Sequence, residues 1–193
     1  MGCRTEGRYP YGPRPRRLRG MSSPQADVSV RPARPGDEAA VARIQVDSWV
    51  AALGERLGPR RHTAFDQQAI EDGWRTAITS PPTADHRVYV ATQEGEVAGF
   101  VAVAGPKDII ALEVAPDRRR RGHGSRLLAA AADHLRDAGG TRMRLWALEK
   151  DRVRAEFLRG AGFAEAGMRR ELDGPGILIP EVLWHSALTE TDA

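Results

Sequence analysis

An apolar segment, an arginine-rich loop and a glycine pair follow one another in the middle of the chain. The segment IIALEV (109–114) has the length and composition of a buried strand. A helix is predicted from 122 to 138, because four of its apolar residues share one face: Leu127, Leu128, Ala131 and Leu135. Pro116-Asp117 turns the chain between the two elements. The middle of the chain is therefore predicted to form a strand, a loop and a helix in direct succession.

The loop itself has the chemistry of an anion site. The first turn of a helix has free N–H groups and the positive end of the helix dipole. Gly122 and Gly124 allow the backbone to approach a phosphate closely at that point. Arg119, Arg120 and Arg121 can add charge-assisted hydrogen bonds. The loop is therefore predicted to bind a phosphorylated cofactor.

Other sites built on glycine loops fit the same stretch less well. A dinucleotide site needs a third glycine, but the residue three after Gly124 is Leu127. A Walker loop needs Gly-Lys-Ser or Gly-Lys-Thr, which this loop lacks. A nucleic-acid surface would need aromatic or further basic support, and the flanks of the loop are apolar. A solvated arginine run before a capped helix remains the structural alternative.

The other predicted elements give a mixed α/β order with a central hairpin. Strands are expected at 28–32, at 86–105 as a hairpin around Glu94-Gly95, at 141–148, and around 163–170 and 179–187. Pro35-Gly36-Asp37 opens one helix, Thr63 is expected to cap a second that ends before Pro81-Pro82, and a third is expected near 152–161.

Length and composition indicate one globular domain with a tail. The 193 residues suit a single core, predicted over 27–190, and no run approaches the ~20 apolar residues that span a bilayer. Residues 1–26 lack apolar periodicity and are predicted to be disordered, with Met21 as a second potential start. Cys3 is the only cysteine, which favours a reducing cytoplasm. Abundant Arg, Ala and Gly beside two lysines suggest a GC-rich bacterial source.

The net charge of +3 comes from the N-terminal tail. Residues 1–20 contain six arginines and one glutamate, a balance of +5, so the rest of the chain carries −2. A basic isoelectric point can indicate nucleic-acid binding. Here the positive charge lies outside the predicted domain, so neither a nucleic acid nor a membrane is expected as partner.

The motifs together resemble the GCN5-related N-acetyltransferase (GNAT) family. Arg119-x-x-Gly122-x-Gly124 is similar to the family's pyrophosphate signature, with Leu112-x-Val114-x-Pro116 before it. RPARPGDEAAVARI (31–44) resembles a GNAT N-terminus, and 144–149 and 157–163 resemble later family segments. The resemblance covers about 28–187. It implies a central, mostly antiparallel twisted sheet with one splayed parallel pair and helices on both faces.

The resemblance also implies acetyl-CoA as cosubstrate and assigns residues to it. The backbone of Leu112, Glu113 and Val114 would pair with the pantetheine arm. The pyrophosphate would lie on N–H groups between Arg120 and Ser125. The cofactor-binding set is then Leu112, Val114, Arg119, Arg120, Arg121, Gly122, His123, Gly124, Ser125 and Asp151.

The implied reaction is direct attack of a primary amine on the thioester, with no metal. Asp108 is the first candidate for the base and Glu113 the second, although each has a structural alternative: a turn end for Asp108, an arginine partner for Glu113. A backbone N–H near Val114 would stabilise the oxyanion. Leu158 stands where the family usually has a tyrosine, so a catalytically weak acyl-CoA-binding module is the alternative function.

The acceptor is left open as a small-molecule or protein amine, and so is a homodimer. Trp49 and Trp74 lie in the region that shapes the acceptor pocket in this family, although core packing is the favoured interpretation of both. Glu181 falls on a late strand that could border that pocket. His123 is expected to be exposed, and the histidines show no metal spacing.

Overall fold

The computed structural model describes residues 28–188, with the side chains of Val28 and His62 excepted. The predicted tail, 1–26, lies outside this range. The elements are β1 (Val28–Pro32), α1 (Glu38–Leu57), the 3-10 helix η1 (Gly58–His62), α2 (Gln67–Thr79), β2 (Arg87–Gln93), β3 (Glu96–Ala104), β4 (Asp108–Val114), the 3-10 helix η2 (Pro116–Arg118), α3 (His123–Asp137), β5 (Arg142–Leu148), α4 (Arg152–Gly160), β6 (Ala164–Asp173) and β7 (Leu178–Ala187).

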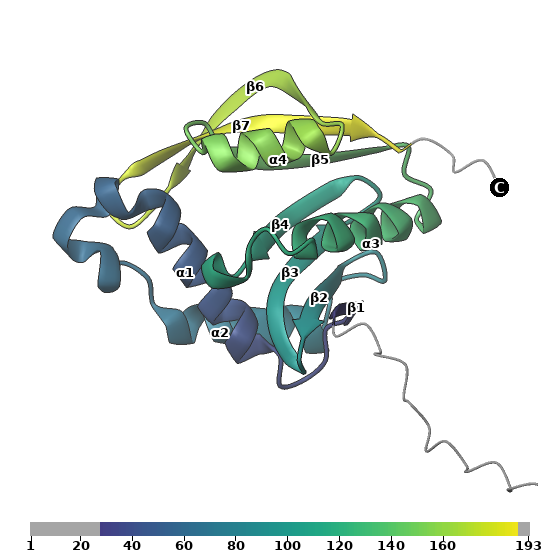
Figure 1. Ribbon diagram of the computed structural model, residues 1–193, viewed down its shortest axis with the longest axis horizontal. Helices are drawn as coiled ribbons and strands as arrows, with labels where there is room; N and C mark the ends of the chain where they lie inside the picture. The colour runs from purple at the N-terminus through teal and green to yellow at the C-terminus, as the bar shows by residue number, and fades with distance from the viewer. Residues whose placement is uncertain (1–27, 189–193) are drawn as a thin grey trace, which may run out of the picture.

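Seven strands form one sheet in the order β1-β2-β3-β4-β5-β7-β6 (Figure 1). Neighbours are antiparallel except β4 and β5, which run parallel. A parallel pair requires a crossover connection, and here that connection is the glycine loop with α3. The expected fold, a mostly antiparallel sheet with one parallel pair, is confirmed.

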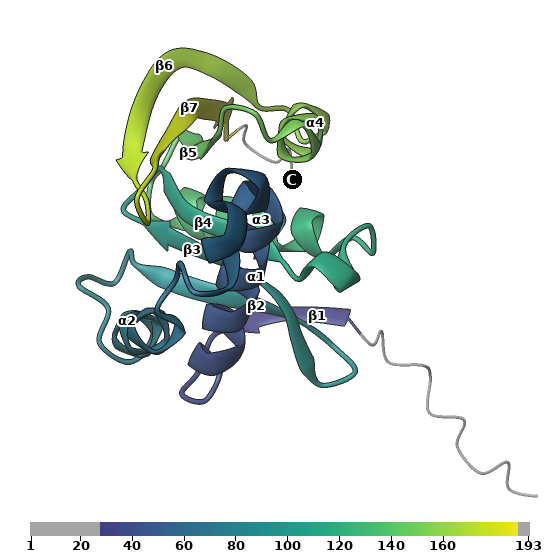
Figure 2. The ribbon, with the colours of Figure 1, turned by 90° about the vertical axis from the view of Figure 1, so that its left-hand side faces the viewer.

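Helices cover both faces of the sheet. α1 and α2 lie on one face, where Val41, Ile44 and Trp74 pack with Phe100 (Figure 2). α3 and α4 lie on the other, where the apolar stripe of α3 joins β4, β5 and β7 in the main core. That stripe is the one predicted from the sequence: Leu127, Leu128, Ala131 and Leu135, each 6% exposed or less.

Most predicted elements are confirmed, but the start of α2 was placed too early. Thr63 ends the 3-10 helix η1, which the sequence did not indicate. The cap of α2 is Asp66, whose carboxylate accepts a hydrogen bond from the Ala69 N–H at 3.0 Å. Aspartate satisfies the free N–H groups at a helix start as well as threonine does, so composition alone could not choose between them.

Among residues 28–188, no helix is long and apolar enough to cross a membrane.

Gly99 sets the close contact between β3 and β4, the strand on which the site is built. It pairs with Val114, and a Cβ added at Gly99 would lie 2.7 Å from the Glu113 carbonyl oxygen and 3.2 Å from Leu127 Cδ1. Real Cβ atoms do not come that close to a backbone oxygen. Any side chain here must therefore push β4 outwards or move α3.

Gly99→Ala is accordingly predicted to lower the free energy of unfolding by about 1–3 kcal/mol, as overpacking does. The matched control is Gly73→Ala in α2, where a Cβ meets nothing within 4 Å. That change is predicted to raise stability by about 0.5–1 kcal/mol, because alanine favours helix. Urea unfolding measures both, and equal effects of the two changes would contradict the role of Gly99.

Candidate functional site

The two parallel strands of the sheet separate soon after they meet. β4 and β5 pair only at Asp108↔Arg144 and Ile109↔Leu145. Beyond Ile109, β4 keeps its partner on the β3 side, where Leu112 lies opposite Val101. Its other edge is free of β5 at residues 112–114, so backbone groups there are available to a ligand.

A cavity of about 410 Å³ lies along this opened edge. Its walls are the end of β4, the glycine loop, the first turn of α3 and the start of α4. Of the ten predicted cofactor-binding residues, only Arg121 does not line this cavity. The nine that line it are Leu112, Val114, Arg119, Arg120, Gly122, His123, Gly124, Ser125 and Asp151.

The loop presents its backbone to the cavity through two left-handed residues. Arg120 has φ 64° and Gly122 has φ 79°. Gly122 is the N-cap of α3 and has no side chain to cap the helix. The first intrahelical bond runs from the Arg126 N–H to the Gly122 carbonyl at 3.2 Å. The N–H groups of residues 123–125 therefore precede the helical ladder, as in a phosphate-binding helix start.

Gly124 is required for space rather than for its backbone angle. A Cβ at this position would lie 3.3 Å from two ring atoms of Phe157 and 3.8 Å from Val114 Cγ2. These contacts already crowd a methyl group, so a longer side chain has to enter the cavity.

Three arginines supply positive charge to the loop. Arg119 donates from Nε to the Val114 carbonyl at 3.3 Å. Within residues 28–188, none of Arg119, Arg120 and Arg121 pairs with a carboxylate, whereas the preceding Arg118 pairs with Glu96 at 2.9 Å. An uncompensated cluster beside free N–H groups is suited to a pyrophosphate.

His123 is buried, which corrects the expectation that it is exposed. Only 1% of it is accessible, and its Nε2 lies 3.0 Å from Gln93 Oε1. Because the amide oxygen only accepts, Nε2 carries the proton. Burial lowers the pKa of His123 below its ordinary 6.5, and neighbouring arginines, Arg126 first, lower it further. The imidazole is therefore neutral near pH 7.

Arg154 on α4 was not identified from the sequence, yet it joins the parts of the site. Its Nη1 donates to the Leu112 carbonyl at 2.9 Å, and its Nη2 to Glu113 Oε2 at 2.6 Å. Its Nε lies 3.6 Å from Asp151 Oδ2. Burial would lower the pKa of Arg154, but the charges of Glu113 and Asp151 raise it above its ordinary value. The guanidinium thus occupies the opened edge of β4.

The two candidate bases lie at opposite ends of β4. They are five residues apart, roughly 16 Å along a strand. Asp108 pairs bidentately with Arg144 where β4 meets β5 and lines neither this cavity nor the next. Glu113, 8% exposed and paired with Arg154, lines both.

A second cavity, of about 580 Å³, opens on the α1 side of the sheet. Trp49 and Phe65 pack there with ring centroids 5.1 Å apart and ring planes tilted by 48°, and the buried Ser48 Oγ has no hydrogen-bond partner within residues 28–188. Core packing was the favoured interpretation of both tryptophans. Trp74 does pack in the core against Phe100, whereas Trp49 lines the cavity.

Glu181, on the late strand β7, also borders this second cavity. It accepts from Arg170 Nε at 2.7 Å, and the Arg170 guanidinium stacks 4.4 Å from the Trp146 ring centroid. No tyrosine lines either cavity within the described residues, and Leu158 is fully buried.

The two cavities meet at the end of β4. The residues common to both linings are Leu112, Glu113, Arg119, Asp151, Val153 and Arg154. A cavity with a phosphate-binding loop therefore touches a second, partly aromatic cavity across one strand. This arrangement is suited to a class of proteins that bring a phosphorylated cofactor to a second substrate.

The comparison with known families agrees with that class. Residues 46–163 match the family described as Acetyltransferase (GNAT) family. The chain therefore belongs to the GNAT family of acetyltransferases.

Relatives and solved structures place the whole described fold in the same group. The N-acetyltransferase YuaI of Bacillus subtilis is 28% identical over 134 residues, 64% of this chain and 73% of that protein. A GCN5-related N-acetyltransferase of Rhodopseudomonas palustris superposes with a TM-score of 0.68 at 22% identity, over 82% and 94% of the two chains. YncA of Salmonella typhimurium, solved with its cofactor acetyl-CoA, gives 0.62 at 18% identity over 86% and 97%.

The buried histidine predicts a pH-dependent stability. An unfolded imidazole takes up a proton as the pH falls through about 6.5, whereas folded His123 resists until a lower pH. The contribution of His123 to the free energy of unfolding is therefore complete above pH 6.5. It is lost as the pH falls through the lowered pKa of the folded state.

Between pH 7.5 and 5.5 the wild type should thus lose more unfolding free energy than His123→Gln, whose amide does not titrate. Urea unfolding at both pH values measures this. Equal losses in the two proteins would show that His123 does not titrate abnormally.

Proposed function

We propose that this acetyltransferase transfers the acetyl group of acetyl-CoA to a primary amine that enters through the 580 Å³ cavity. The observation that carries the proposal is the meeting of two cavities at the end of β4. One has the loop for a pyrophosphate, and the other has room and aromatic walls for an acceptor. A thioester held between them would be open to attack.

In the proposed complex the cofactor lies along the opened edge of β4. The N–H groups of residues 123–125, with Arg119 and Arg120, would hold the pyrophosphate. The free backbone edge at 112–114 would pair with the pantetheine amides, as the GNAT resemblance implies. Arg154 and Arg119, which donate to the Leu112 and Val114 carbonyls, would have to share or release them. Asp151 opposes a phosphate less than its charge suggests, because Arg154 lies beside it.

The chemistry requires a neutral amine nucleophile. Most amines are protonated near pH 7, so a base must remove a proton before or during attack. Glu113 lines both cavities and is therefore proposed ahead of Asp108, which lines neither. A free N–H near Val114 would stabilise the oxyanion.

Departure of the thiolate does not strictly require an acid. A thiol with a pKa of about 8.5 is a good leaving group near neutral pH. The buried Leu158, in place of a tyrosine, is therefore compatible with turnover, with water as proton source.

We further propose a cytoplasmic protein, since the single cysteine, Cys3, has no partner within the chain. The acceptor is proposed to be a small molecule or a protein amine, and a homodimer stays open.

Acetyl-CoA titration against a Gly124→Glu variant tests the cofactor site. A glutamate here would project into the cavity beside Phe157 and repel phosphates. Isothermal calorimetry should show binding by the wild type and at least a 100-fold weaker affinity for the variant. Gly73→Glu, exposed on α2, adds the same charge and should leave binding unchanged.

Absence of binding by a folded wild type would refute the cofactor assignment. Binding without thiol release against any amine would instead support the acyl-CoA-binding module.

Two isosteric variants test the choice of base. With an amine found by screening, Glu113→Gln should lower kcat at least about 100-fold, the usual scale of base catalysis. Asp108→Asn should lower it less than tenfold, through a looser β4–β5 junction. Thiol-release rates over pH 6–9 measure both, and the reverse order would assign the base to Asp108.

A further inference from the structure

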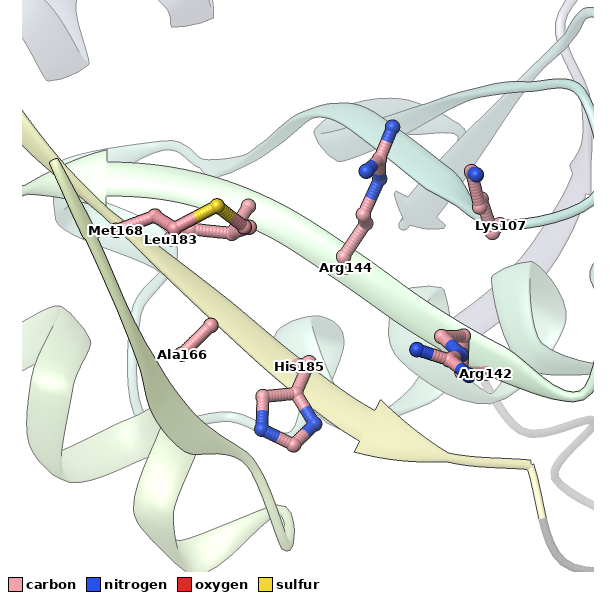
Figure 3. Close-up of a pocket in the computed structure, with 7 residues that line it drawn as sticks. All are labelled: Lys107, Arg142, Arg144, Ala166, Met168, Leu183 and His185. Atoms are coloured by element: carbon pink, nitrogen blue, oxygen red, sulfur yellow. The ribbon is translucent and has the colours of Figure 1, made fainter. Parts of the chain in front are cut away.

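A third cavity, of about 510 Å³, lies against β5, β6 and β7 (Figure 3). It is lined by basic groups from the β3–β4 turn, β5 and β7: Lys107, Arg142, Arg144 and His185. Neither the cofactor loop nor the proposed chemistry uses any of them.

The charges in this cavity are not balanced. Arg144 pairs with Asp108, which does not itself line the cavity. Within residues 28–188, neither Lys107 nor Arg142 has an ion-pair partner. Like charges held together repel one another, and an anion bound between them would relieve that repulsion and gain charge-assisted hydrogen bonds.

β6 supplies an apolar wall to the cavity. Its register with β7 shifts between Glu165 and Arg169, and Gly167 there has φ 74°. Ala166 and Met168 of this irregular stretch line the cavity, and Met168 is 51% exposed. The result is a largely apolar cavity with basic side chains in its lining, here called the basic pocket, which is suited to an organic anion.

The basic pocket and the proposed acceptor cavity of about 580 Å³ share no lining residue, but they lie next to each other on one face of the sheet. Arg142, Arg144 and Trp146 alternate on β5 and so share a face, and Trp146 lines the acceptor cavity. On β7, His185 and Glu181 share a face in the same way. Neighbouring residues on one face of a strand are roughly 7 Å apart.

We propose that this pocket binds the anionic group, a carboxylate or a phosphate, of an acceptor whose amine reaches the end of β4. The inference rests on the proposed function and narrows its substrate class. Arg144 lies opposite Asp108. On β4, Asp108 comes four residues before Leu112, which is roughly 13 Å along a strand. The acceptor is therefore an extended molecule with an amine and an anion on the order of 10–15 Å apart, such as a short peptide with a free carboxylate.

Binding is tested first without turnover, on the full chain loaded with CoA so that the cofactor loop is occupied. Inorganic phosphate is titrated, and the imidazole resonances of His185 are followed by NMR. They should shift saturably. Arg142→Glu should weaken the phosphate affinity at least tenfold, whereas Arg43→Glu, an exposed reversal on α1, should not change it.

The acceptor is tested next with matched amines. Tri- and tetrapeptides with a free C-terminal carboxylate are compared with their amides, and ω-aminoalkyl phosphates with the corresponding alcohols. The anionic member of a pair should have a KM at least tenfold lower. In Arg142→Glu that advantage should disappear, and in Arg43→Glu it should persist. The preferred series distinguishes carboxylate from phosphate.

The outcomes separate this inference from the proposed function. Failure of CoA to bind, measured beforehand, concerns the cofactor site alone. The basic pocket is not an anion site if the His185 resonances do not shift on addition of phosphate. The same conclusion follows if Arg142→Glu and Arg43→Glu lower the phosphate affinity equally. A phosphate response without any preference among the amines would overturn its role in the acceptor.

Discussion

The separation of β4 from β5 after two residue pairs is the constraint on which the site depends. A sheet normally satisfies its backbone groups by continuing, and here the edge of β4 at 112–114 is left open inside the protein. The Arg154 guanidinium reaches it from α4, 42 residues away in sequence, and bonds the Leu112 carbonyl. The glycine loop follows directly, because a parallel partner requires a crossover and that crossover is α3. Cofactor cavity, acceptor cavity and shared residues all arise from one interrupted ladder.

Local signals in the sequence predicted most of the architecture. Glu94 and Gly95 have φ of 54° and 83°, the paired positive angles of a tight hairpin turn, where the sequence placed the turn. The Gly122-x-Gly124 loop and the α3 stripe were also predicted, because a strand, a turn and an amphipathic period each depend on neighbours within a few residues. The family resemblance added a mostly antiparallel sheet with one parallel pair, which no local pattern contains.

Contacts between distant residues could not be predicted in this way. His123 is buried beside Gln93, 30 positions earlier, whose side-chain oxygen accepts its hydrogen bond, and nothing in the loop motif indicates that partner. Nothing in the sequence around Arg154 indicates its contacts with Leu112 and Glu113 on β4. The sequence ranked Asp108 ahead of Glu113 as the candidate base, yet only Glu113 lines the two cavities. Residue type therefore indicated which groups could act, and packing decided which of them meet.

The irregular stretch of β6 has a consequence for self-association. β6 is the last strand of the sheet, and a regular edge strand offers its unpaired backbone to any other strand. Between Glu165 and Arg169 the ladder with β7 is interrupted, and Gly167 turns the backbone out of the extended conformation. A strand from another molecule could not add along the whole of this edge without a break of its own. The bend that walls the basic pocket thus also protects the sheet against uncontrolled growth.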